Sequence, residues 1–478
     1  MTRPRRAAAV VLLVALAALL APSALAHEAA PAGVSRIELS LGARDLVLTI
    51  TTPPAGGGRM PVVVLAREDA PPGEVTVAAA RPGGAGTPVA VPVGPAGRPH
   101  DAVLTADGPG PWEVVVADGA AVARVPVDVP APAPTPGWVW AVRVAAVVGV
   151  VALVAALALR HRPRVALALG VVAVVGVTVA VTAASTAPAT TAAPAPTPTP
   201  APAAGGHAGH AGMADMPAMP AAAPMSVPTA MAPGSVVVAA RTATPATAAT
   251  PVDLVLDLTD SSGGTVVDDL AIHDDALIHL AVIGPDGQVT HVHPVRTAPG
   301  RYVVRLVPPV AGRYGVFAEM ERAGDGGHQV ARTAFAVAGA PATAAPAPGP
   351  GARQVGDLQA DVAVSGAVAG RPARVAAAFS RAGAPVTDLQ SWLGMAGHLL
   401  VLGPGLAGTP DPVDPASAFG HVHDMRPAGP AGTYGPEVAF DVTFPQPGRY
   451  ALWAQVQRDW RVVTVPVTVD VAPETPAP

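Results

Sequence analysis

Short apolar runs alternate with turns rich in proline and glycine over most of the chain. In the first part, 27–132, each valine-rich run is long enough for one strand, and the proline and glycine between the runs favour turns. This spacing predicts an N-terminal β-sandwich over 27–132. The expected strands are 37–41, 45–51, 60–66, 74–80, 89–93, 112–117 and 121–129.

Two later stretches, 251–338 and 355–473, have the same alternation and look like diverged copies of one another. Each contains, in the same order, a histidine–leucine pair, a histidine–valine–histidine triplet and a strand that begins glycine–arginine–tyrosine. We therefore predict a mainly β fold of tandem immunoglobulin-like β-sandwiches. Linkers rich in proline and alanine are expected at 185–250 and 339–354.

Two stretches, 138–159 and 165–184, break this pattern because they are almost uniformly apolar. About 20 helical residues span the roughly 30 Å hydrocarbon core of a bilayer. The loop between them, 160–164, carries three arginines and is predicted to be cytoplasmic. The sequence thus predicts a transmembrane hairpin of two spans, with the N-terminal and C-terminal domains on the extracytoplasmic side of the cell membrane. The alternative is a pair of buried helices in a soluble domain.

Residues 1–26 have the pattern of a secretory signal peptide. Three arginines precede an apolar run at 7–20, and the alanine–leucine–alanine at 24–26 is a cleavage site of the usual type. Cleavage there would make His27 the first residue of the mature chain. The alternative is an uncleaved anchor helix.

Within the predicted disordered linker, 207–231 is rich in histidine and methionine. Core packing does not explain methionines in such a stretch, whereas thioether sulfur and imidazole are ligands for copper. The alternative is chance drift in a low-complexity segment. The candidate ligands are His207, His210, Met213, Met216 and Met219.

The strongest chemical signal is the histidine pattern of the two distal sandwiches. In the first of them, His291 and His293 are two residues apart on a predicted strand, so both side chains point to one face. His279 on the preceding strand supplies a third imidazole, and His273 and Glu319 are further candidates. Three nitrogen ligands on a rigid sheet suit a transition metal.

The other distal sandwich repeats this arrangement with His398, His421 and His423. Tryptophan stands at 392, where the first copy has His273, so the site there is expected either to be smaller or to recruit Met395 or Met425 instead. The sequence therefore predicts one metal site in each distal sandwich. The alternative is that these histidines cap turns or form structural hydrogen-bond networks.

Composition excludes several kinds of site and partner and favours particular metals. The chain has 478 residues and no cysteine, so disulfides, thiolate metal sites and cysteine nucleophiles are excluded. The formal net charge is -5 and there is no basic tract, so no nucleic-acid partner is expected. Histidine with nearby methionine favours copper, as Cu(I) or Cu(II), and histidine alone leaves zinc open.

The run from His273 to Leu280, followed by Thr290 to Pro294, resembles exported immunoglobulin-like modules of the YtkA-like or FixH-like kind, and 355–473 resembles them as well. Such modules are often encoded near copper and heavy-metal transport functions, so the resemblance implies metal handling. A mature N-terminus at His27 is similar to CopC-like copper carriers, in which a terminal histidine chelates copper.

Taken together, the sequence predicts a non-enzymatic, membrane-anchored, extracytoplasmic copper-binding protein for copper homeostasis or resistance. It would capture or buffer copper, or hand it over to a copper transporter or oxidase. One alternative is a copper-dependent oxidoreductase that uses His27. Another is a structural or adhesion β-sandwich surface protein without metal.

Overall fold

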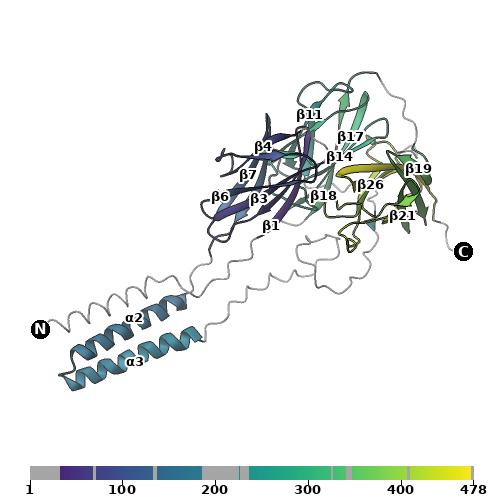
Figure 1. Ribbon diagram of the computed structural model, residues 1–478. Helices are drawn as coiled ribbons and strands as arrows, with labels where there is room; N and C mark the ends of the chain where they lie inside the picture. The colour runs from purple at the N-terminus through teal and green to yellow at the C-terminus, as the bar shows by residue number, and fades with distance from the viewer. Residues whose placement is uncertain are drawn as a thin grey trace. The chain divides into compact units, whose positions relative to one another are not determined.

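The computed structural model describes residues 33–67, 72–132, 137–185, 225–226, 236–323, 327–340, 347–405 and 410–474 (Figure 1). The two helices belong to one compact unit and the sheets to another. The described strands form six sheets that are antiparallel almost throughout, so the prediction of a mainly β chain is confirmed. The predicted signal peptide, His27 and the histidine–methionine patch at 207–219 lie outside the described residues.

The N-terminal sandwich consists of two four-stranded sheets, ordered β1-β2-β3-β6 and β5-β4-β7-β8. One of its strands, β6, was not predicted from the sequence. Its inward positions are Ala102, Leu104 and Ala106, and the small alanines weaken the apolar alternation. The strands are β1 Val34–Leu41, β2 Arg44–Thr51, β3 Gly58–Arg67, β4 Gly73–Ala80, β5 Val89–Val93, β6 Pro99–Ala106, β7 Gly110–Asp118 and β8 Ala121–Val129.

The second sandwich pairs a sheet ordered β10-β11-β16-β15 with one ordered β12-β17-β13-β14, in which β18 also pairs with β17. Strand β10 lies inside the stretch predicted to be linker. It forms there because alternate valines point inward and the strand pairs with β11. The strands are β10 Val236–Thr242, β11 Val252–Asp260, β12 Leu270–Ala271, β13 His279–Ile283, β14 Val289–Val292, β15 Val295–Ala298, β16 Arg301–Leu306, β17 Gly312–Arg322 and β18 His328–Val337.

The third sandwich has the same plan, with a sheet ordered β19-β20-β21-β25-β9 facing one ordered β24-β23-β26-β27. Strand β22 pairs with β21 beside this path. The strands are β9 Met225–Ser226, β19 Gly351–Val355, β20 Leu358–Ser365, β21 Pro372–Arg381, β22 Ala384–Pro385, β23 Gly397–Gly403, β24 Ala418–Asp424, β25 Glu437–Thr443, β26 Gly448–Arg458 and β27 Arg461–Val471.

The second and third sandwiches pack against each other through one sheet of each. Strands β13 and β23 are buried at every position, which requires cover on both of their faces. One face fills the core of its own sandwich. The other joins an apolar cluster shared by both sandwiches, in which the rings of Phe317 and Phe419 stack with centroids 4.3 Å apart.

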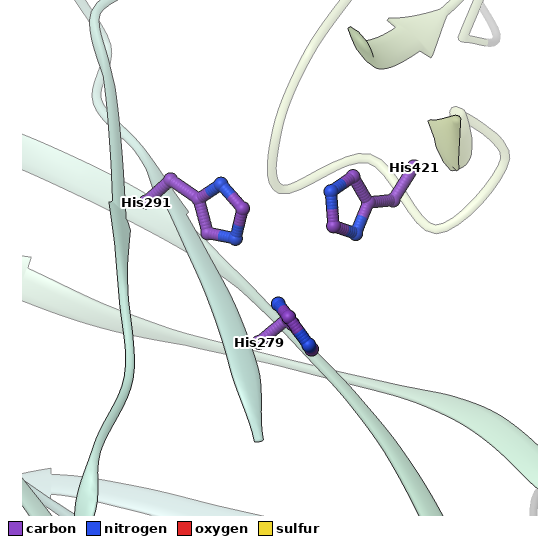
Figure 2. A group of neighbouring side chains, drawn as sticks. All are labelled: His279, His291 and His421. Carbon is purple, nitrogen blue, oxygen red and sulfur yellow. The ribbon is translucent and has the colours of Figure 1, made fainter. Parts of the chain in front are cut away.

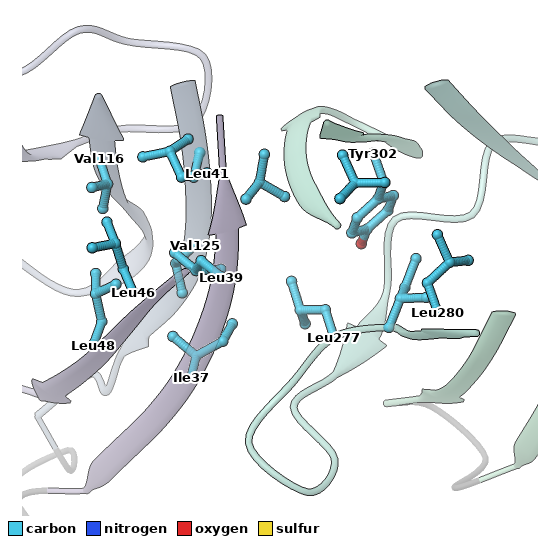
Figure 3. Packing of buried hydrophobic residues seen from close by; sticks show 14 of the residues in the cluster. Ile37, Leu39, Leu41, Leu46, Leu48, Val116, Val125, Leu277, Leu280 and Tyr302 are labelled. Carbon is cyan, nitrogen blue, oxygen red and sulfur yellow. The ribbon is translucent and has the colours of Figure 1, made fainter. Parts of the chain in front are cut away.

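The N-terminal sandwich packs against the second sandwich, and a single cluster of buried apolar residues continues through both (Figure 3). Strand β1 also bonds to the neighbouring main chain: Glu38 N donates to Asp275 O at 2.7 Å, and Ser40 N donates to His293 O at 2.9 Å. These bonds place the polar side of β1 beside the second sandwich's histidines.

Two tyrosines make the same local hydrogen bond in the two distal sandwiches. The hydroxyl of Tyr314 donates to Val310 O at 2.8 Å, and that of Tyr450 donates to Gln446 O at 3.0 Å. A tyrosine that bonds back to the main chain a few residues upstream is the corner motif of immunoglobulin-like domains.

We expect Tyr450→Phe to lower the free energy of unfolding of the third sandwich by about 1–2 kcal/mol, because the hydroxyl's partly buried hydrogen bonds to Gln446 O and from Gln446 N are lost while the ring packing is kept. Thermal and urea unfolding would measure the change. Tyr434→Phe is the matched control, since the Tyr434 hydroxyl makes no hydrogen bond among the described residues. Equal unfolding curves for the two variants would contradict the motif's role.

Helices α2, Gly137–Ala158, and α3, Pro163–Ser185, form where the apolar stretches predicted them. They approach closely at Gly176, where an added Cβ would lie 2.8 Å from Ala145 O. Over the part of the chain that the structure describes, however, neither helix is long and apolar enough to cross a membrane, a crossing that needs about 20 apolar residues. The predicted transmembrane hairpin, with its two spans and membrane anchor, is therefore wrong.

Candidate metal centre

Six histidines from the second and third sandwiches gather where the two sandwiches meet. On strands β13 and β23, His279 and His398 share a face with the apolar residues of the shared cluster, because alternate side chains point the same way. His421 and His423 lie on β24, and His291 and His293 lie on and just after β14. The sequence predicted the two triplets but placed them in separate sites, whereas the structure joins them.

One ring nitrogen of His279 and His398 is held by a main-chain carbonyl. His279 Nε2 donates to His273 O at 3.0 Å, and His398 Nε2 donates to Trp392 O at 3.1 Å. Trp392 therefore takes the place of His273 in the third sandwich, as predicted. Its main-chain carbonyl accepts the hydrogen bond from His398 as that of His273 does from His279. With neutral rings, this bond leaves the lone pair on Nδ1 in both histidines.

His291 and His421 are each held by a side chain of the other sandwich. His291 Nδ1 donates to Gln455 Oε1 at 3.0 Å, and His421 Nδ1 donates to Glu319 Oε2 at 2.6 Å. Glu319 stands opposite His279 in the β13–β17 pairing, and Gln455 stands opposite His398 in β23–β26. The contacts are therefore reciprocal, and the cluster requires both sandwiches.

Carboxylates lie beside the last two histidines. His293 Nδ1 is 3.5 Å from Glu38 Oε1, and His423 Nδ1 is 3.4 Å from Asp274 Oδ2. Glu38 belongs to the N-terminal sandwich and is also paired with the buried Arg67. Burial disfavours the Glu38 carboxylate, but the charge of Arg67 and the hydrogen bond from His293 lower its pKa to about 2. All three sandwiches thus contribute to the centre.

Each of the six histidines therefore has one nitrogen directed at a carbonyl, amide or carboxylate oxygen. This is the support that metal-binding histidines have in proteins, because it fixes the tautomer and the ring orientation. A carboxylate pattern of this kind was not found in the sequence, since Glu38, Asp274 and Glu319 come from distant positions.

The other nitrogens face into the cluster. Four of them, on His279, His291, His293 and His423, are buried and make no hydrogen bond among the described residues. The remaining two, His398 Nδ1 and His421 Nε2, lie 3.0 Å apart. Two nitrogens bound at about 2.0–2.1 Å to one tetrahedral ion are separated by about 3.3 Å, so this spacing fits a shared metal.

Two groups of three nitrogens have the compactness of a metal site. One nitrogen each from His279, His291 and His421 lie within 4.8 Å of one another, and the same holds for His398, His421 and His423. Figure 2 shows the first group, with the rings of His279, His291 and His421 turned toward a common space. His421 belongs to both groups.

Burial favours the neutral form of four of these imidazoles, those of His279, His291, His398 and His423. Desolvation, followed by the neighbouring imidazoles His293 and His421, lowers the pKa of His279 well below its usual value. The pKa values of His291 and His398 fall well below that value for the same reasons, and that of His423 falls to about 3. Neutral imidazole is the form that binds metal.

The remaining candidates are placed as follows. His273 and Glu319 lie at the edge of the cluster, together with His328, which is not among the predicted ligands. Met395 is buried in the turn that begins at Trp392, and Met425 follows β24. Their predicted role as ligands stays a prediction.

Comparisons with known proteins do not assign a family. The model for "Domain of unknown function (DUF8832)" matches residues 353–473, the third sandwich, which is less than half of the chain. No curated protein matches the chain. The resemblance to YtkA-like or FixH-like modules therefore stays a prediction.

Solved structures give only distant likenesses. A tetra-tandem repeat from the extending region of a large adhesion protein has 10% identity and a TM-score of 0.17, with 91% of this chain and 82% of that chain covered. Invasin, a bacterial integrin-binding protein, has 11% identity and a TM-score of 0.15, covering 92% and 60%. The trypsin-activated alpha-2-macroglobulin from Escherichia coli has 12% identity and a TM-score of 0.16, covering 90% and 24%. Scores this low carry no argument about function.

Proposed function

We propose that this protein binds a transition-metal ion in the buried cluster of six histidines between its second and third sandwiches, and that copper is the first candidate for this ion. The observation that carries the proposal is the hydrogen bonding of the rings. Each ring has its outer nitrogen beside an oxygen of the protein, and four of the six inner nitrogens have no hydrogen-bond partner among the described residues. A structural network of histidines would pair both nitrogens of most rings.

The donor set favours copper or zinc. Calcium and magnesium take oxygen ligands, so a cluster of imidazoles does not suit them. Among divalent ions of the first row, copper binds a given nitrogen site most tightly; zinc binds it less tightly but also takes imidazole ligands, in tetrahedral geometry. Copper is therefore the first candidate and zinc the second.

The role proposed is binding rather than catalysis. His279, His398 and His421 have exposed fractions of 3%, 0% and 5%. A catalytic metal keeps a position open for its substrate, and ligands buried to this degree are better suited to holding an ion. The signal-like pattern at 1–26 supports an extracytoplasmic location. We accordingly infer a role in capturing or buffering copper, or in handing it over to a transporter or oxidase.

The test is a copper(II) titration of the full metal-free chain at pH 7.5, followed by electron paramagnetic resonance. We expect tight binding with hyperfine splitting from at least three imidazole nitrogens. Each of the single variants His291→Ala and His421→Ala should lose both the tight binding and this splitting. His291 belongs to the second sandwich and His421 to the third, so loss of the same copper signal in both variants would distinguish one shared centre from two independent sites. The absence of tight copper and zinc binding would overturn the proposal and favour the structural or adhesion alternative.

A further inference from the structure

A second group of possible ligands lies on the solvent side of the six-histidine cluster. His273, Glu319 and His328 each offer one ligand atom, and these atoms lie within 4.8 Å of one another. His328 lies at the start of β18, opposite Glu321 of β17 in the strand pairing. Its side chain is 39% exposed, whereas Glu319 is almost fully buried. The group therefore extends from the surface to the edge of the buried cluster.

Glu319 connects this group to the proposed metal centre. Its Oε1 accepts a hydrogen bond from His328 Nε2 at 2.5 Å, and its Oε2 accepts one from His421 Nδ1 at 2.6 Å. One carboxylate thus contacts the outer group with one oxygen and supports an inner ligand with the other. The two groups are adjacent and do not compete for a ligand atom.

Carboxylates surround the outer group, and in the metal-free protein they lie beside both nitrogens of His273, so a bound ion would replace one of these contacts. His273 Nε2 lies 3.1 Å from Asp274 Oδ2, and His273 Nδ1 lies 3.1 Å from Glu321 Oε2. With Glu319, three carboxylates surround two imidazoles. Two histidines and one carboxylate are a common ligand set for divalent transition metals, and the further carboxylates offset the charge of the ion.

We propose that His273, Glu319 and His328 form a second metal site, which binds a divalent transition-metal ion with mixed nitrogen and oxygen ligands and is coupled through Glu319 to the buried cluster. The coupling rests on the proposed function, because it acts on His421, one of the inner ligands. Binding at the outer site does not rest on it.

The coupling has a defined direction. An ion on Glu319 Oε1 withdraws negative charge from the carboxylate and weakens Oε2 as the acceptor for His421 Nδ1–H. Since supporting partners of this kind commonly change metal affinity by about 10- to 100-fold, the outer ion is expected to lower the affinity of the inner site by up to about 10-fold.

Copper(II) titration of the full chain with electron paramagnetic resonance tests this inference. We expect two distinct copper species, one with imidazole nitrogens only and one with mixed nitrogen and oxygen ligands. His328→Ala should remove the mixed species alone, and His421→Ala the imidazole-only species alone. Glu319→Gln should remove the mixed species and weaken the other by about 10-fold. His100→Ala, a histidine of the N-terminal sandwich, is the control and should change neither.

The possible failures are distinguishable. A single imidazole-only species that His328→Ala leaves unchanged would overturn the second site and leave the proposed function in place. A single mixed species that His421→Ala leaves unchanged would overturn the proposed function and support the outer site. Loss of both species in His328→Ala, with the far-ultraviolet circular dichroism of the wild type, would overturn the assignment of two separable sites.

Discussion

Replacing His421 by alanine is expected to lower the copper affinity of the buried cluster by about 100-fold or more. His421 is the one residue in both groups of three histidine nitrogens, and its Nε2 lies 3.0 Å from His398 Nδ1. Removal of this one ring therefore leaves two ligands in each group. Competition titration of the metal-free chain against a chromophoric copper chelator at pH 7.5 would measure the loss.

Two further variants show whether such a loss is specific. His421→Gln keeps a polar side chain of similar length beside Glu319, so it preserves more of the interface and should still lose copper affinity. His161→Ala removes an exposed histidine outside the sandwiches and should have no effect. If His421→Ala bound copper as tightly as the His161→Ala control, the cluster would not be the metal site.

The histidine chemistry was predictable from the sequence because its signals are local. A histidine–valine–histidine triplet and a histidine–leucine pair each define a strand face, and two copies in the same order identify equivalent residues. The structure bears out this equivalence, down to the carbonyls of His273 and Trp392 that hold His279 and His398.

The merging of the two predicted sites was not foreseen, although the sequence contains a signal for it. Ala281 and Ile283 share the face of His279, and Leu400 and Leu402 share that of His398. Strands exposed on one face would carry polar residues at these positions. Two strands, each apolar apart from one histidine, predict that each sheet is buried on both faces. In the structure the outer faces of these two sheets bury each other.

The contribution of the N-terminal sandwich has no local signal. Glu38 is a single acidic residue in an alternating strand, and only the packing of β1 against the second sandwich brings it beside His293 and Trp392. His328 was missed for a related reason. In the sequence it directly follows glycines, where a turn and exposure are the ordinary expectation, whereas in the structure it begins β18 and contacts the buried Glu319 of the neighbouring strand.

Acid is expected to destabilise the metal-free protein below about pH 6.5. His279, His291, His398 and His423 have pKa values lowered by burial, that of His423 to about 3. Once unfolded, each returns to about 6.5, so below that pH the unfolded chain binds more protons than the folded chain. Stability therefore falls as the pH decreases from about 6.5 toward 3, by about 1.4 kcal/mol per pH unit for each histidine that stays neutral.

The other titrating groups of the centre shift this window little. Burial lowers the pKa of His273, but the hydrogen bond to Asp274 and the charges of Asp274, Glu319 and Glu321 together raise it; the hydrogen bond to Glu319 raises the pKa of His328 against burial. These two histidines therefore favour the folded state at low pH. The pKa values of Glu38 and Asp274 are lowered to about 2 and that of Glu319 well below its usual value, and these carboxylates add to the loss only below about pH 4.5. Between about pH 6.5 and 4.5 His273 and His328 are protonated in both the folded and the unfolded chain, so the pH dependence there comes from the four histidines whose pKa is lowered.

Urea unfolding of the metal-free chain at pH 7.5, 6.5 and 5.5 would measure this dependence. The variant His398→Gln lacks one of the four neutral histidines, so its stability should depend on pH less steeply than that of the wild type, by about 1.4 kcal/mol per pH unit. Equal stability of the wild type at pH 7.5 and 5.5 would show that these imidazoles are not buried in neutral form. Saturating copper should raise the stability at all three pH values with little change in the slope, because it binds the folded chain through imidazoles that are already neutral there.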